Sequence, residues 1–157
     1  LWTRANPRSA AQVDLEGEQG LVMDQQTSAD LREELGWGSH MLLTATPAAT
    51  VLVYWRGQVI LRRGLICAVP FKPGDICTRV MDRETTISLV NTELFPGRSE
   101  FDSVLQNLPA VVISPLGKNG VVVVGGWSKR CFSQSDERWL EGWTQRLKTS
   151  LEKDSSD

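Results

Sequence analysis

Two cysteines offer the most direct route to chemistry in this chain of 157 residues. Cys67 and Cys77 lie on either side of the turn-forming run Lys72-Pro73-Gly74-Asp75. Such a pair supports thiol chemistry when one sulfur is a nucleophilic thiolate and the other resolves the intermediate. The plainer interpretation, which we favour, is that both are small apolar residues, because free cysteines are commonly buried.

Cys131 and His40 are the other residues with reactive side chains. Cys131 follows Lys129 and Arg130 and precedes the last expected helix, and both the positive charge and a helix N-terminus favour a thiolate. We therefore predict that Cys131 is the most reactive thiol. His40 is the single histidine, a candidate haem ligand or proton donor against a plain surface or core role. One histidine and three scattered cysteines do not predict a metal site.

A further candidate site is the run Phe95-Pro96-Gly97-Arg98-Ser99-Glu100-Phe101-Asp102. Arg98 suits a bidentate pair with Glu100, with Asp102 or with a partner's carboxylate, and Phe101 suits a plug against a sheet. The alternative is a loop held by its own internal ion pair. Among six tryptophans, Trp2, Trp37 and Trp127 are candidates for exposed contact with a partner protein.

Bulk composition bounds the class of protein. The chain is 41% hydrophobic, enough for one domain with a real core, and its net charge of -2 argues against a nucleic-acid surface. The three cysteines form no CxxC motif, which favours a reducing compartment. No apolar run approaches the roughly 20 residues that span a bilayer. The chain starts at Leu1 without a methionine, so we expect a trimmed fragment of a membrane-anchored protein.

The elements that must position these residues follow from local patterns. Apolar runs around turns predict hairpins over residues 50–61 and 109–127, and a brief strand over 86–90. Helical spacing predicts a first helix that is capped by Thr27 or Ser28 and ends at Pro47, and a short helix capped by Asp75. A capping box predicts a last helix after Phe132, and residues 91–108 form a long connection.

This order predicts an α+β fold in which an antiparallel sheet carries the two terminal helices on one face. The short helix and the long connection cover the other face. We assign residues 1–26 to a linker or loose arm that follows a removed membrane anchor, 27–153 to the domain, and 154–157 to a polar tail. The order resembles a GAF domain, in which ligands, where present, lie between the sheet and the covering loop.

GAF-type reductases of free methionine sulfoxide look similar around Cys67 and Cys77. That family places a third cysteine in the loop before the central hairpin and acidic residues after its second strand. Here residues 91–108 contain no cysteine, and Gly125, Gly126 and Trp127 stand where the acidic residues would be. The enzyme interpretation therefore lacks its nucleophile.

A second resemblance covers roughly residues 30–147. It rests on five segments, of which the Pro-Gly-Arg-Ser-Glu run and the following Pro-Leu-Gly hairpin are the most specific: Ile87-Ser88-Leu89-Val90-Asn91, Pro96-Gly97-Arg98-Ser99-Glu100-Phe101, residues 108–117, Gly125-Gly126-Trp127, and Phe132-Ser133 with Asp136. Together they resemble the family named for cofactor assembly of complex C (B subunits). No catalytic residues can be carried over from that family, which favours an accessory factor over an enzyme.

The resemblance implies a function and a location. Members are expected in the thylakoid membrane of chloroplasts, or its cyanobacterial equivalent, with a GAF-like domain on the stromal side of N-terminal transmembrane helices. They would help attach a c-type haem covalently to cytochrome b6 during biogenesis of the cytochrome b6f complex. Implied partners are related assembly subunits and apocytochrome b6, and haem is the one cofactor it raises. The alternative is a small-molecule GAF domain or thiol reductase relying on Cys67 and Cys77.

Overall fold

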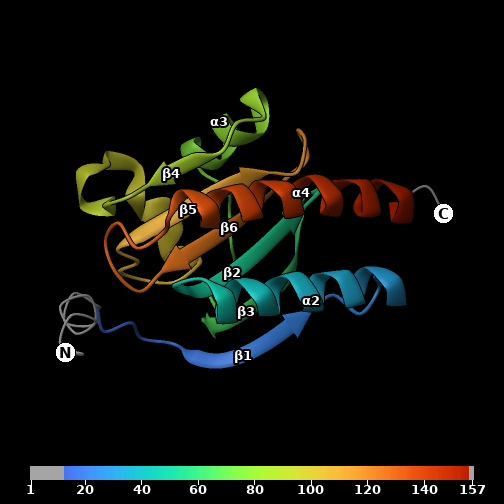
Figure 1. The fold of residues 1–157 in the computed structure, drawn as a ribbon, viewed down its shortest axis with the longest axis horizontal. Helices are drawn as coiled ribbons and strands as arrows, with labels where there is room; N and C mark the ends of the chain where they lie inside the picture. Colours follow the sequence, from blue (N-terminus) through green and yellow to red (C-terminus); the bar gives the residue numbers. More distant parts are fainter. Residues whose placement is uncertain (1–12, 156–157) are drawn as a thin grey trace.

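Valine-rich segments near the middle of the chain form the centre of a six-stranded sheet (Figure 1). The computed structural model describes residues 13–155. Its elements follow one another as β1 (Glu18–Met23), α2 (Ala29–Ala45), β2 (Ala48–Trp55), β3 (Gln58–Ile66), α3 (Asp75–Arg83), β4 (Ile87–Leu89), the 3-10 helices η2 (Thr92–Leu94) and η3 (Pro96–Ser103), β5 (Ala110–Pro115), β6 (Gly120–Gly126) and α4 (Gln134–Ser155). The expected order of helices and hairpins is present.

The sheet has the strand order β1-β3-β2-β6-β5-β4, and every neighbouring pair is antiparallel. The β5–β6 hairpin lies beside the β2–β3 hairpin because β2 pairs with β6 along its length, from Ala48 opposite Gly126 to Trp55 opposite Gly120. Both central strands are buried almost throughout, as their unbroken apolar runs predicted. This antiparallel sheet with helices confirms the predicted α+β class.

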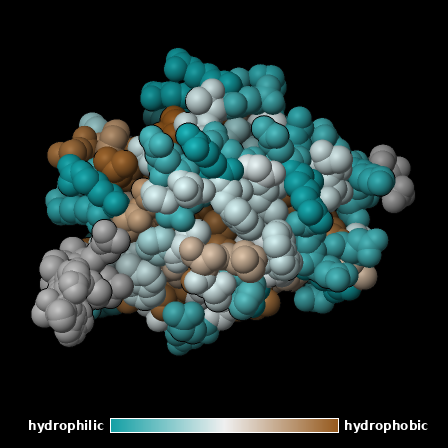
Figure 2. Space-filling view, viewed as in Figure 1, coloured by the Kyte–Doolittle hydropathy of each residue, from teal (hydrophilic) through white to brown (hydrophobic). Residues whose placement is uncertain are grey.

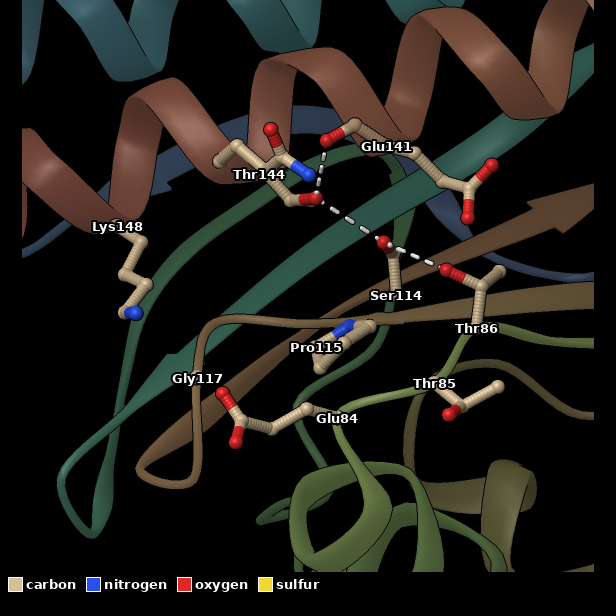
Figure 3. A pocket seen from close by; sticks show the side chains of 10 residues that line it. Glu84, Thr85, Thr86, Ser114, Pro115, Gly117, Glu141, Thr144 and Lys148 are labelled. Carbon is tan, nitrogen blue, oxygen red and sulfur yellow. Dashed lines mark hydrogen bonds between the residues drawn. The ribbon is translucent and has the colours of Figure 1, made fainter.

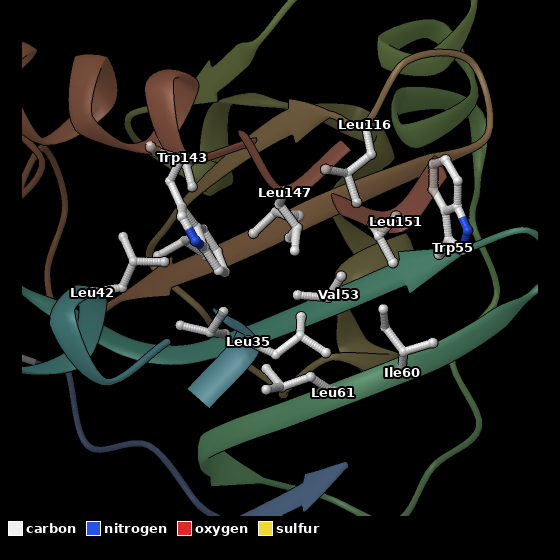
Figure 4. Packing of buried hydrophobic residues seen from close by; sticks show 14 of the residues in the cluster. Leu35, Leu42, Val53, Trp55, Ile60, Leu61, Leu116, Trp143, Leu147 and Leu151 are labelled. Atoms are coloured by element: carbon white, nitrogen blue, oxygen red, sulfur yellow. The ribbon is translucent and has the colours of Figure 1, made fainter. Parts of the chain in front are cut away.

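Helices α2 and α4 lie side by side on one face of the sheet (Figure 1). Alternate strand residues such as Val51 and Val53 point to these helices and meet their leucines, including Leu35 and Leu147, which are fully buried (Figure 4). Gly38 allows the indole of Trp143 to lie directly on the α2 backbone, since a Cβ there would lie 2.0 Å from Trp143 Cε2. The predicted small residue on this helix face is therefore a packing site for an aromatic ring.

The opposite face is covered by α3 and by residues 91–108, as predicted. The intervening strand residues, such as Leu52 and Val123, meet Val80, Phe101 and Leu105 in a second buried cluster. Phe101 is only 2% exposed, so it plugs this face of the sheet as its sequence suggested.

Two segment assignments differ from the sequence-based ones. Part of the expected loose arm, Glu18–Met23, forms strand β1 at one edge of the sheet by pairing with β3. Its sequence Glu-Gln-Gly-Leu-Val-Met has little strand pattern, so the pairing with β3 decides its conformation. Helix α4 continues through Ser155, into the expected polar tail, and the first 12 residues of the arm lie outside the described residues.

Candidate functional site

The site with the most predicted residues is the covering segment, residues 91–108. Its base is closed by Thr92, whose amide donates to Pro109 O at 3.0 Å and whose hydroxyl donates to Leu108 O at 2.6 Å. Asn91 Oδ1 caps η2 by accepting from the amide of Glu93 at 3.2 Å. The segment is therefore a structured cover with fixed side-chain positions.

Glu100 ties this cover to α3. Its carboxylate accepts from the backbone amides of Gly74, Ile76 and Cys77 at 3.0, 2.8 and 3.1 Å, which supplies partners for the free N–H groups at the start of the helix. Two expectations are corrected here. Asp75 does not cap α3, because the N-cap is Gly74 and a side chain from the covering segment takes the capping role. The carboxylate is also bound to these amides, so no internal pair with Arg98 forms among the described residues.

Lys129 fixes the other side of the cover. Its ammonium lies 2.8 Å from Glu93 Oε2, and this hydrogen bond lowers the pKa of the Glu93 carboxyl. The amide of Arg130 donates to Val90 O at 2.7 Å. These contacts join the segment before α4 to the covering segment, which lies about 30 residues earlier in the chain.

A groove of about 340 Å³ lies between these two parts. We call it the loop groove, and its polar lining consists of Thr92, Glu93, Arg98, Ser99, Asp102, Asn107 and Lys129. Phe101, Leu105 and Leu108 line it beneath. The structure therefore brings together three of the predicted candidates, Arg98, Phe101 and Asp102.

Arg98 is an unpaired cation of the loop groove. Its side chain is exposed and makes no hydrogen bond or ion pair with any residue the structure describes. Apolar side chains lie on the same segment: Leu94 is 66% exposed and Val90 41%. Figure 2 shows apolar atoms gathered over this part of the surface. An unpaired guanidinium beside exposed apolar groups suits a partner that offers a carboxylate and an apolar side chain.

The paired cysteines do not form a reactive site. Cys67, Cys77 and Cys131 are all unpaired thiols. Cys77 is fully buried, and burial, followed by the nearby Glu100 carboxylate, raises its pKa well above the ordinary value of 9.0. Cys67 Sγ lies 3.5 Å from Val104 O, facing the covering segment. A thiolate at Cys77 is disfavoured, which removes support for the reductase alternative.

The other reactive candidates are separate from this pair. Burial raises the pKa of Cys131, so the expected thiolate is wrong, because desolvation outweighs the hydrogen bonds that favour ionisation. His40 lies exposed on α2, on the opposite side of the sheet from Cys77 in α3. No group of three or more potential metal ligands occurs among residues 13–155.

The tryptophan candidates differ in exposure. Trp127 is half-buried and packs against the cluster beneath the covering segment, and its backbone O accepts from the amide of Val13 at 2.9 Å. Trp37 is 49% exposed on α2, with its ring centroid 5.8 Å from that of Trp139. Trp37 is thus the better candidate for an aromatic partner contact, and Trp2 lies outside the described residues.

A polar pocket of about 390 Å³ lies between α4 and the ends of β4 and β5 (Figure 3). A chain of hydroxyls forms its floor: Thr86 Oγ1 and Thr144 Oγ1 each lie 3.1 Å from Ser114 Oγ. Because Thr144 donates to Glu141 O at 2.9 Å, Ser114 must donate to Thr144 and Thr86 to Ser114. The chain is internally satisfied and joins α4 to the strands, so we interpret it as structural.

Similarity to solved structures defines the class of fold. The chain is 15% identical to a type II free methionine-R-sulfoxide reductase from Thermoplasma acidophilum, with a TM-score of 0.65 over 80% of this chain and 94% of that one. It is 12% identical to the GAF domain region of a putative membrane protein from Geobacter sulfurreducens, with a TM-score of 0.67 over 78% of this chain and 93% of that one. The fold is therefore that of a GAF domain, as predicted.

The family follows from sequence. The model of the CCB2/CCB4 family, the B subunits for cofactor assembly of complex C, matches residues 1–147, so the chain belongs to that family, and the predicted resemblance is confirmed. It is 27% identical over 163 residues to CCB4, the chloroplastic member of this cofactor-assembly family from Arabidopsis thaliana. That match covers 96% of this chain and 55% of the relative, so the chain spans about half the length of the relative. Among the described residues, no helix is long and apolar enough to cross a membrane.

Proposed function

We propose that this GAF-like domain is the protein-docking part of an assembly factor for complex C, the cytochrome b6f complex. Its task is to assist covalent attachment of a c-type haem to cytochrome b6. The family and the name of the Arabidopsis relative support a role in cofactor assembly. The step at cytochrome b6 comes from the family resemblance and remains part of the proposal.

The observation that carries a docking role is the loop groove. It presents the unpaired Arg98 beside the exposed Leu94, on a cover that Glu100 and Lys129 hold in place. The space under that cover, where GAF domains hold ligands, is occupied here by Phe101, Leu105 and other buried side chains. A preorganised surface over a filled core suits recognition of a protein rather than storage of a small molecule.

The proposed setting follows from the relative. The Arabidopsis protein is chloroplastic, and we propose the same compartment, or its cyanobacterial equivalent, for this chain. The domain would face the stroma at the thylakoid membrane, joined to an anchor in a part of the protein outside this sequence. Its partners would be related assembly subunits and apocytochrome b6.

Complementation of a photosynthetic host that lacks the full-length protein tests this function. We expect the wild-type gene to restore haem that stays on cytochrome b6 in denaturing gels, detected by its peroxidase activity. The double variant Arg98→Glu with Leu94→Asp should reduce both this signal and co-purification of apocytochrome b6. Arg138→Glu makes the same charge change at an exposed position of α4 and is the control.

Two outcomes would contradict parts of the proposal. If the double variant matches the control, the loop groove is not the docking site. If the wild-type gene restores another cofactor of the complex while the haem on cytochrome b6 never depended on it, the assigned step is wrong.

A further inference from the structure

Strand β1 is an open edge of the sheet. It has six residues and pairs only with β3, whereas the opposite edge strand, β4, has three. Edge strands usually carry a lysine, a proline or a bulge that prevents another strand from adding. β1 has none of these, and its register with β3 runs without a shift from Glu18 opposite Ile66 to Met23 opposite Leu61.

The hydrogen-bond phase shows which backbone groups face outward. The amide of Asp24 donates to Ile60 O at 3.0 Å, so these two residues form a hydrogen-bonded antiparallel pair. Such pairs alternate along the ladder, so Val22, Gly20 and Glu18 also bond to β3. The N–H and C=O groups of the residues between them therefore point away from β3: Gln19, Leu21 and Met23.

Apolar side chains accompany this free backbone. Leu21 is 48% exposed and Val22 is 59% exposed, although both are in a strand. Met23 packs against the core under α2 and α4, so Leu21 lies on that face and Val22 on the other. An added strand would cover apolar surface on both faces of the sheet.

The charge around the edge is one-sided. Residues 13–31 contain no lysine or arginine, but they contain five acidic residues: Asp14, Glu16, Glu18, Asp24 and Asp30. The guanidinium groups on the adjacent β3 are engaged elsewhere: Arg62 donates to Val69 O at 2.6 Å and Arg63 to Gly36 O at 2.7 Å. A second copy of this edge would bring like charges together, whereas a basic segment would complement them.

We propose that β1 receives an extended basic segment of a partner protein as a seventh strand. The segment alternates lysine or arginine with apolar residues and bonds through its backbone to Gln19, Leu21 and Met23. This is β-strand addition, in which main-chain hydrogen bonds supply affinity and side chains supply selectivity. The site lies on a different element from the loop groove and does not depend on the role in haem attachment.

The test uses the full chain and a labelled ten-residue peptide of alternating valine and lysine. We expect saturable binding by fluorescence anisotropy, and no binding of a peptide with glutamate in place of lysine. The same lysine peptide with N-methyl groups along one edge cannot donate to β1, so its binding should fall at least tenfold. Amide hydrogen exchange should slow at Gln19, Leu21 and Met23 only, because the alternate amides already bond to β3.

Variants of the chain complete the test. Leu21→Pro removes an outward N–H and leaves the β3 ladder its donors, so binding should be lost, and the unchanged alternate amides would show that the strand persists. Glu16→Lys with Glu18→Lys should favour the glutamate peptide. Equal binding of plain and methylated peptides, or protection spread evenly along β1, would overturn the proposal. So would protection of the outward amides that rises with protein concentration without peptide, since a second copy would then be the occupant.

Discussion

Single residues of the covering segment act over long sequence distances. Arg98, Glu100 and Phe101 were selected from sequence because of their types, and the plug formed by Phe101 was predicted correctly. The role of Glu100 was not, because its three amide donors come from α3 and the turn before it, more than 20 residues earlier in the chain. A single sequence carries no local signal for a cap supplied by a distant side chain.

Replacing Glu100 tests this cap. Glu100→Ala leaves three amides at the start of α3 without their acceptor, so we expect the free energy of unfolding to fall by about 2 kcal/mol. Asp102→Ala removes a carboxylate from an exposed position of the same segment and should change it by less than about 0.5 kcal/mol. Urea unfolding followed by circular dichroism measures both. Equal effects of the two substitutions would contradict a capping role.

The buried thiol of Cys77 predicts a pH dependence. Burial raises its pKa above the ordinary value of 9.0, so the folded protein keeps this proton at a pH where the unfolded chain loses it. The unfolded state then binds fewer protons, and stability falls as the pH rises above about 9. Unfolding curves at pH 8 and pH 10 should show a larger loss for wild type than for Cys77→Ala. Parallel losses in the two proteins would contradict the assignment.

At the scale of elements, local sequence signals performed well where both ends of a contact are close in the chain. Ser28 caps α2 by accepting from the amide of Leu31 at 3.2 Å. Ser133 and Asp136 exchange hydrogen bonds of 2.9 and 3.1 Å at the start of α4, which confirms the predicted capping box. Strand β1 was missed because its partner β3 lies some 40 residues further along and its own pattern is weak.

Two glycines of α2 offer a matched pair of substitutions. Gly36→Ala places a methyl group where nothing lies within 4 Å and should stabilise the helix by about 0.5 to 1 kcal/mol. Gly38→Ala places the same group 2.0 Å from the ring of Trp143, so α2 and α4 must separate and stability should fall by about 2 kcal/mol. Thermal unfolding of both variants gives the comparison. A stabilising Gly38→Ala would show that the helices are not in the contact described.

At the scale of the whole molecule, the sheet separates the reactive side chains that the sequence presented as one set. The fold class and the helix arrangement could be predicted because apolar periodicity marks which faces are covered. The spatial relation of His40, Cys77 and Cys131 could not, because it depends on which strands pair. Pairing places His40 on the helix side and Cys77 beneath α3 on the other side.

That separation predicts how the domain responds to haem. A haem site needs an axial ligand that opens into a cleft, but Cys77 is fully buried and His40 lies exposed on the outer side of α2. We expect titration of the full chain with haem to leave the Soret band without a stoichiometric shift at low micromolar concentration. His40→Ala and a variant with all three cysteines changed to serine should behave like wild type. Stoichiometric binding that either variant abolishes would instead make this a haem-handling domain, and its ligand would be the residue removed. A flat titration means that any haem is carried by a partner, so that the function of this domain rests on the surfaces through which it docks.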